Sequence, residues 1–175
     1  MSTETIMWLL PIVFMLHDFE EIIMMKPWIG REQGALMQRF PRFMGRIIPH
    51  VSKLSTSSFS FAVLFMFALI TVLTLISVEC KLYSLWSGFL VGFGLHAIIH
   101  IIQFIVYRKY VPVIITSFPA LLYSLLAFYT VYTRLNLEIM PILLWSMIAV
   151  TLLPISVLVA HYLAGRFETW LSGRF

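Results

Sequence analysis

The sequence contains a single cysteine, Cys80, among its 175 residues. An internal disulfide and a cysteine-based metal cluster are therefore excluded, because each needs at least two thiols. Charge is also scarce, since aspartate, glutamate, lysine and arginine together make up 11% of the residues. Hydrophobic residues make up 61% of the chain, which is more than a soluble domain of this size can bury. The composition therefore indicates an integral membrane protein.

Five apolar stretches are long enough to cross a bilayer, which takes about 20 helical residues for a hydrocarbon core of roughly 30 Å. They lie at about 5–25, 56–78, 85–107, 111–133 and 139–163. The first stretch is preceded by no basic segment and followed by no small-residue cleavage site, so we expect it to be retained and not removed as a signal peptide. The pattern predicts an all-α bundle of five transmembrane helices that forms one domain, residues 1–175.

Basic residues are distributed unevenly between the loops. Ten of them lie in the first loop, the third loop and the tail: Lys26, Arg31, Arg39, Arg42, Arg46, Lys53, Arg108, Lys109, Arg166 and Arg174. The other side of the membrane receives Lys81 and Arg134. The positive-inside rule therefore places the N-terminus outside the cell and the C-terminus in the cytoplasm.

The loop after the first span, residues 26–53, mixes basic residues with aromatic ones such as Trp28 and Phe43. Pro41 and Pro49 divide it into short pieces. This composition is typical of a segment that lies along the cytoplasmic headgroups, although a basic loop that only fixes the topology has the same composition. The net charge of +4 favours contact with anionic membrane lipids and not with nucleic acid.

Four polar side chains interrupt the first span in the stretch MLHDFEEIIMM: His17, Asp18, Glu20 and Glu21. On a helix of 3.6 residues per turn, His17, Glu20 and Glu21 share one face, and Asp18 lies about 100° away from His17. Each charged group costs about 2.5–3.5 kcal/mol at the middle of a membrane, so we expect these residues to have a function. The alternative is that the carboxylates reach the cytoplasmic headgroups and pair with Lys26 and Arg31.

The third span carries a polar stripe of its own in the stretch GFGLHAIIHIIQF. His96 and His100 are four residues apart, and Gln103 continues the same helix face. Two imidazoles one turn apart on a helix are a common chelating arrangement, because their ring nitrogens can converge on one cation. Alternatively, the two histidines hydrogen-bond to neighbouring helices.

These polar groups are predicted to lie at a similar depth in the membrane. His17 lies nine residues before the basic loop and His100 eight residues before Arg108, which is roughly 12–13 Å at 1.5 Å per residue. Glu21 and His161 each lie five residues before the next basic residue. The first, third and fifth spans run in the same direction, so these groups are expected to meet in the cytoplasmic half of the membrane.

Imidazole and carboxylate together form the ligand set of zinc, and also of iron or manganese. We favour Zn²⁺ bound by side chains drawn from His17, Glu21, His96, His100 and His161, with Asp18 and Gln103 as supporting contacts. The doublet Glu20 and Glu21 suits a division of roles in which one carboxylate binds metal and the other acts as general base. The sequence leaves open which carboxylate has which role. A site for two metal ions is less well supplied with carboxylates.

The leading interpretation is a membrane-embedded, metal-dependent hydrolase that acts on a lipid or lipid-like substrate from the cytoplasmic leaflet. A second interpretation is a transporter subunit that handles protons or a metal ion. A third is a non-enzymatic membrane protein with a structural metal site.

The segment HDFEE at 17–21 is an H-x-x-E-E motif in a first span, and KPW follows at 26–28. Together with the histidine pair at 96 and 100, it resembles the HXXEE-domain membrane proteins, which are small and mostly bacterial. The resemblance covers nearly the whole chain and implies a multi-pass protein of the bacterial inner membrane. It also implies that His17, Glu20 and Glu21 are the motif residues. It implies no activity, so the chemistry above depends on the residues alone.

Overall fold

The computed structural model describes residues 1–174, which form six α-helices and no strands. The helices are α1 (Thr3–Arg39), α2 (Pro41–Val51), α3 (Thr56–Glu79), α4 (Tyr83–Tyr107), α5 (Ile114–Arg134) and α6 (Ile139–Ser172). The prediction of an all-α fold is confirmed.

Four of these helices, α3, α4, α5 and α6, are long and apolar enough to cross a membrane. The first predicted span, in α1, is not among them. Its apolar stretch carries Asp18, Glu20 and Glu21 close together, and these three charges reduce its hydrophobic character below that of the other helices. Five spans therefore stay a prediction, of which four are supported by the helices themselves.

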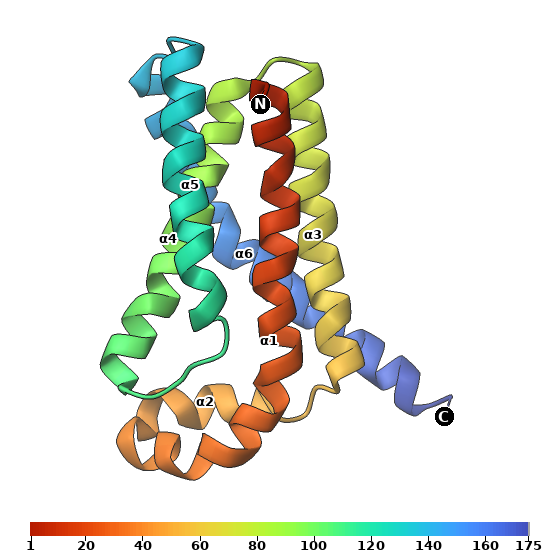
Figure 1. Cartoon of the computed structure of the whole chain (residues 1–175). Helices are drawn as coiled ribbons and strands as arrows, with labels where there is room; N and C mark the ends of the chain where they lie inside the picture. Colours follow the sequence, from red (N-terminus) through yellow and green to blue (C-terminus); the bar gives the residue numbers. More distant parts are fainter. Residues whose placement is uncertain (175) are drawn as a thin grey trace.

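Helix α1 is longer than the sequence pattern predicts, because it continues through Pro27 as far as Arg39. Its last third turns across the base of the bundle, where α2 also lies (Figure 1). Prolines are the usual cause of such bends in a continuous helix, since they remove one backbone hydrogen bond. The expected break at Pro49 is absent from the described helix α2, which contains this proline near its end.

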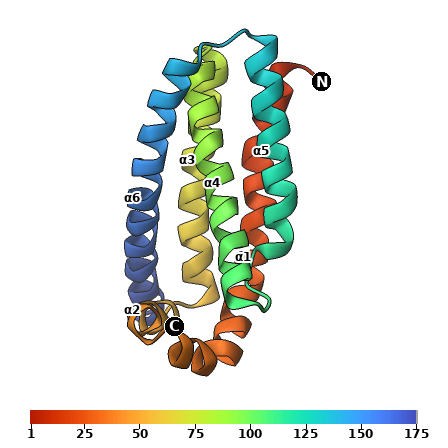
Figure 2. The same ribbon diagram turned by 90° about the vertical axis from the view of Figure 1, so that its left-hand side faces the viewer.

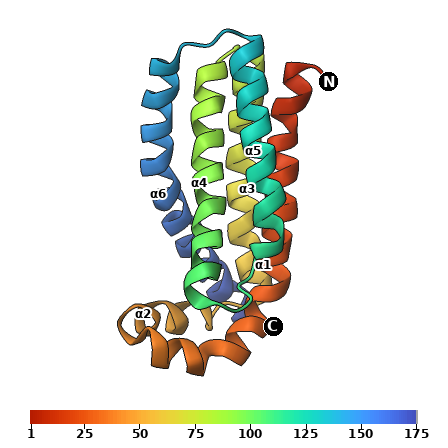
Figure 3. The same cartoon turned by 60° about the vertical axis from the view of Figure 1, so that its left-hand side comes forward.

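The five long helices form a ring in which each contacts two neighbours extensively. The order around the ring is α1, α3, α6, α4 and α5, and back to α1. Figures 2 and 3 show α4 between α6 on one side and α5 with α1 on the other. This order brings α1 and α4, which carry the polar stripes, to opposite sides of a shared interior.

Helix α6 crosses the bundle at an angle, so it changes partner along its length (Figure 1). Near its start, Trp145 packs against Gly88 of α4, where a Cβ on the glycine would lie 2.5 Å from the Cβ of Trp145. Near its end, Ala160 and Ala164 pack against Ala62 of α3. Small residues allow the close approach of helices at both crossings.

Candidate metal centre

Three imidazoles from two helices converge inside the bundle. They belong to His17 of α1 and to His96 and His100 of α4, and one ring nitrogen of each lies within 4.8 Å of those of the other two. His17 is fully buried, and its ring centroid lies 5.6 Å from that of His96 and 5.4 Å from that of His100. The chain spacing explains the pairing within α4, because residues four apart lie on the same helix face.

A hydrogen-bond chain from α5 fixes the orientation of the His17 ring. The hydroxyl of Thr116 donates to Oε2 of Glu20 at 2.7 Å, and it lies 3.3 Å from Nδ1 of His17. Because a hydroxyl has one proton and gives it to the carboxylate, it accepts the proton of His17 Nδ1. This network assigns the tautomer of His17 in which Nε2 has a free lone pair. Nε2 is buried and has no hydrogen-bond partner among residues 1–174.

The same logic applies to His100. Its Nδ1 lies 3.0 Å from Oε1 of Gln103, an amide oxygen that can only accept. His100 Nε2 is therefore unprotonated, and it faces Nε2 of His96 at 3.1 Å. Two nitrogens bound to one tetrahedral zinc ion lie about 3.3 Å apart, as the usual zinc–nitrogen distance of about 2.0–2.1 Å requires. The pair His96 and His100 therefore has the spacing of two ligands of one ion, and His17 and His100 have the outer hydrogen bonds that orient metal-binding histidines.

Glu20 points away from the triad and binds the start of α5. Its carboxylate accepts hydrogen bonds from the hydroxyl of Tyr110 at 2.8 Å and from the backbone amides of Thr116 at 2.9 Å and Ile115 at 3.4 Å. With the Thr116 hydroxyl, this makes four donors, which suits an ionised carboxylate because it can only accept. A carboxylate at a helix N-terminus also interacts favourably with the helix dipole. Glu20 thus holds α5 and, through Thr116, the ring of His17.

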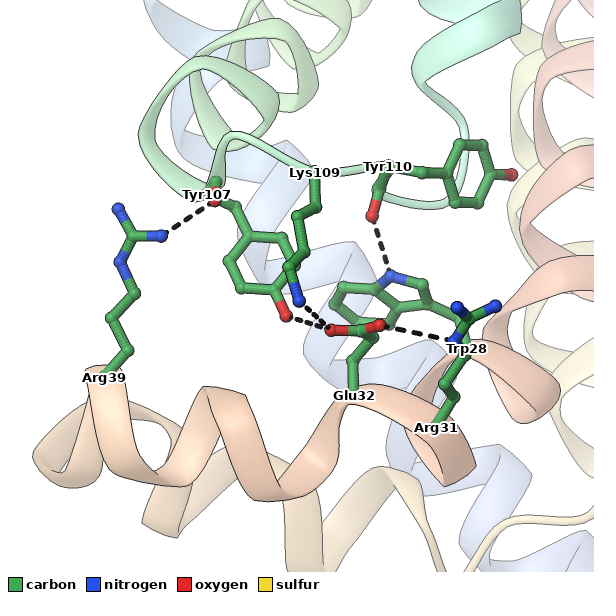
Figure 4. Close-up of polar contacts among 7 residues, drawn as sticks. All are labelled: Trp28, Arg31, Glu32, Arg39, Tyr107, Lys109 and Tyr110. Atoms are coloured by element: carbon green, nitrogen blue, oxygen red, sulfur yellow. Dashed lines mark hydrogen bonds and ion pairs between the residues drawn. The ribbon is translucent and has the colours of Figure 1, made fainter.

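A second network holds the loop that carries Tyr110 (Figure 4). The indole of Trp28 donates to the carbonyl of Tyr110 at 2.8 Å, and Glu32 accepts from Tyr107 at 2.6 Å and pairs with Lys109 at 3.2 Å. The Tyr107 hydroxyl and the Lys109 ammonium lower the pKa of the Glu32 carboxyl, so Glu32 keeps its charge below the usual pH range for carboxylate protonation. Burial and the nearby Glu20 carboxylate raise the pKa of Tyr110, so its hydroxyl stays a donor.

The basic residues of the base do not pair with the carboxylates of the first span. Lys26 donates to the backbone carbonyls of Ser52 and Leu54 at 3.1 and 2.6 Å. Arg31 lies 3.6 Å from Glu32, as Figure 4 also shows. The alternative in which Lys26 and Arg31 neutralise these carboxylates is therefore not the arrangement in the described chain.

Next to the triad lies a cavity of about 480 Å³ between α1, α3, α4 and α6. Its polar lining consists of Asp18, Glu21, His96, His161 and Ser156, and its other walls are apolar. His96 therefore belongs both to the triad and to the cavity wall. His161 lies on the α6 wall with its ring 6.2 Å from that of Phe59.

The structure thus brings together His17, His96 and His100 with Gln103 as the supporting contact. Within residues 1–174, neither Glu21 nor His161 belongs to the group of converging ligand atoms, although both line the cavity beside it. Asp18 faces the same cavity.

Sequence reasoning missed Thr116 and Tyr110, which hold Glu20 and His17 in place. A residue count from Arg108 does not give the depth of Thr116, because the connection between Tyr107 and Ile114 is not helical and has no fixed rise. A lone threonine near a helix start is usually a local backbone contact, which hides this role.

The fold and the site together define a helical protein with membrane-span helices and a buried histidine triad. Residues 8–130 match the family described as "Protein of unknown function with HXXEE motif", and the chain belongs to this family. The H-x-x-E-E residues are His17, Glu20 and Glu21, all within the matched range. No curated protein and no solved structure matches the chain.

Proposed function

We propose that this protein is a membrane-embedded, metal-dependent hydrolase that acts on a lipid or lipid-like substrate. The observation that carries the proposal is the triad of His17, His96 and His100, whose ring nitrogens converge beside a cavity lined by carboxylates. A metal held by three histidines keeps an open coordination position, which distinguishes catalytic sites from closed structural ones. Zn²⁺ is the preferred ion, with iron or manganese as alternatives.

The proposed placement in the membrane has α1 crossing the bilayer beside α3 and α5, with the N-terminus outside and the C-terminus in the cytoplasm. The ten basic residues on the base side support this orientation. Helix α2 and the last third of α1 then lie at the cytoplasmic headgroups (Figure 1). Arg42 and Arg46 on α2 favour anionic lipids there.

His17, His96 and His100 would hold the ion, which when bound would lower the pKa of a water to about 7. Glu21, which lines the same cavity as His96, would take a proton from the water that adds to the carbonyl carbon of the substrate. The bond from this carbon to the leaving oxygen or nitrogen then breaks, and Glu21 returns the proton to the leaving group. His17 and His100 are held in orientation by Thr116 and Gln103. Of the two motif glutamates, Glu20 is engaged with α5, so Glu21 is the one available for proton transfer.

The first experiment measures metal content by plasma mass spectrometry on detergent-purified protein. We expect near-stoichiometric zinc in the unmodified protein and its loss in His96→Ala. The matched control is His161→Ala, which removes another imidazole from the same cavity but none from the triad, and should keep the metal. A folded, metal-free unmodified protein would refute the metal site and favour a transporter in which carboxylates and imidazoles relay protons.

A further inference from the structure

The cavity is elongated, with its polar groups at one end. Along α3 it extends from Phe59 to Ile76, which is about 26 Å at 1.5 Å per residue. Along α4 it extends from His96 back to Leu85, about 16 Å by the same rise. Beyond the level of His96 the lining is apolar along all four helices. The volume of about 480 Å³ is in the range of ligand-binding pockets.

The apolar end opens to the side of the bundle. Leu69 and Ile76 of α3 and Leu152 of α6 line the cavity although they are 42%, 45% and 43% exposed. The crossing of α6 explains this opening, because α6 contacts α4 near its start and α3 near its end. In a membrane, the mouth between α3 and α6 faces the lipid chains.

The polar end contains a buried hydrogen-bond acceptor that no donor reaches. Asp18 is 6% exposed, and its Oδ1 has no hydrogen-bond partner in the described part of the chain. Glu21 lies one turn further along the same cavity wall. Among the described lining residues there is no lysine and no arginine. An anionic headgroup would therefore find no counter-charge in the cavity, whereas a donor would satisfy a buried acceptor that is costly to leave unpaired.

We propose that this cavity binds a single-chain lipid whose polar end is uncharged and donates a hydrogen bond, as a long-chain primary amide does. The chain enters between α3 and α6, and its polar end reaches Asp18 and Glu21 beside His96. The claim that this lipid is the substrate rests on the proposed hydrolase. The claim that the lipid binds rests only on the shape of the cavity and on its lack of lysine and arginine.

The test is a competition experiment with the purified full-length protein in phosphatidylcholine nanodiscs. A long-chain amide that carries a photoreactive diazirine labels the protein, and hexadecanamide or hexadecanoate competes. The buffer contains EDTA, so that binding is measured without hydrolysis. We expect hexadecanamide to compete at least about tenfold better than hexadecanoate, since burying a carboxylate without a counter-ion costs more than the 1.4 kcal/mol that equals tenfold. Mapped cross-links are expected on α3 residues that line the cavity.

Two matched variants separate the cavity from the general lipid surface. Leu69→Trp narrows the cavity and should reduce labelling at least fivefold. Leu75→Trp changes a residue of the same helix that is 45% exposed and does not line the cavity, so it should leave labelling unchanged. Asp18→Asn adds an amide N–H that a carboxylate can accept from, and should reduce the preference for the amide over the carboxylate to less than about threefold.

Equal competition by both lipids, or equal labelling of the two tryptophan variants, would overturn the inference. The result is independent of the proposed function, because His100→Ala, which removes a triad residue that does not line the cavity, should lose metal and turnover but retain labelling. Normal cavity labelling together with an unmodified protein that is purified without metal would refute the hydrolase alone. Metal-dependent activity without cavity labelling would refute the lipid-binding inference alone.

Discussion

At the scale of single residues, the two neighbouring glutamates of the motif face different parts of the molecule. Successive residues on a helix are about 100° apart, so Glu20 faces α5 while Glu21 faces the cavity with Asp18. His17 lies between these directions and faces α4. One turn of α1 therefore contacts a helix start, a histidine pair and a cavity. This explains how three charged groups are accommodated in an otherwise apolar segment.

The glutamate variants are expected to have different effects. Glu20→Gln weakens the bonds to α5 and should lower the free energy of unfolding by about 1–3 kcal/mol, as expected for hydrogen bonds to a charged group. Glu21→Gln should retain the metal and the fold but lower kcat by about 10²–10⁴-fold, as loss of a general base does. Thermal unfolding, metal content and turnover measured on both variants check the prediction. Similar and harmless behaviour of the two variants would contradict both roles.

Thr116 is expected to affect metal binding without contacting the metal. Thr116→Val removes the hydroxyl that accepts from His17, so metal affinity should fall about 10–100-fold, as it does when outer contacts of metal ligands are lost. Thr116→Ser keeps the hydroxyl and should restore the affinity. Thr133→Val is the matched control on the same helix, because its hydroxyl bonds to the carbonyl of Tyr129. Chelator competition measures all three, and an equal loss in Thr133→Val would indicate a general effect on α5.

At the scale of helices, the crossing of α4 and α6 depends on glycine. A Cβ at Gly88 would lie 2.5 Å from the Cβ and 2.6 Å from the backbone carbon of Trp145, whereas at Gly92 the nearest atom is 3.3 Å away. Near Gly165 of α6 no atom lies within 4 Å of such a Cβ. An alanine substitution is therefore expected to change the free energy of unfolding differently at Gly88, Gly92 and Gly165.

Gly88→Ala should lower the free energy of unfolding by about 1–3 kcal/mol, because the two helix backbones must separate. Gly92→Ala should cost less, since Ala149 needs to move by only a small distance. Gly165→Ala should raise stability by up to about 1 kcal/mol through helix propensity. Thermal unfolding in one detergent measures the series, and an equal effect at all three positions would contradict the packing described for α4 and α6.

The long helices were largely predictable from the sequence, whereas the base of the bundle, formed by the last third of α1 and by α2, was not. Three predicted spans correspond to α3, α4 and α5 within a few residues, because long apolar runs have few alternatives in a membrane. The fourth begins with α6, which continues past the predicted end at residue 163 to Ser172. The sequence predicts that α1 ends near residue 25, whereas tertiary contacts such as the Trp28 bond to Tyr110 hold the helix past Pro27. A proline only disfavours helix continuation, and contacts of this kind override that preference.

The candidate site was predictable to a similar extent. The four-residue spacing of His96 and His100 predicts that they share a helix face. The similar predicted depth of His17 in the membrane indicates that it lies near them. The same depth argument also selected His161, which lies on the cavity wall and not in the triad. Depth gives the level of a residue but not its rotation about the helix axis, and rotation decides which side chains converge. The roles of Thr116 and Tyr110 depend on which helix lies next to α1, which the sequence does not state.

At the scale of the whole molecule, the single cysteine is a natural probe of orientation. Cys80 is exposed at the end of α3, at the end of the bundle opposite the one that carries most of the basic residues. In intact cells, a membrane-impermeant maleimide should label Cys80 in the unmodified protein. The combined variant Cys80→Ser with Arg108→Cys places the thiol at the base end and should be labelled only after permeabilisation. The reverse pattern would mean that the N-terminus lies in the cytoplasm.

All the side chains of the triad and its supports lie between residues 17 and 116, whereas α6 begins at Ile139. The ribosome therefore synthesises every residue of the candidate metal centre before it begins the last helix. Helix α6 supplies only the final wall, which turns an open groove beside His96 into the cavity. Since membrane proteins are inserted from the N-terminus onward, the nascent chain would be able to bind the proposed ion while the candidate centre is still accessible. Synthesis of the last helix then closes the chamber around it.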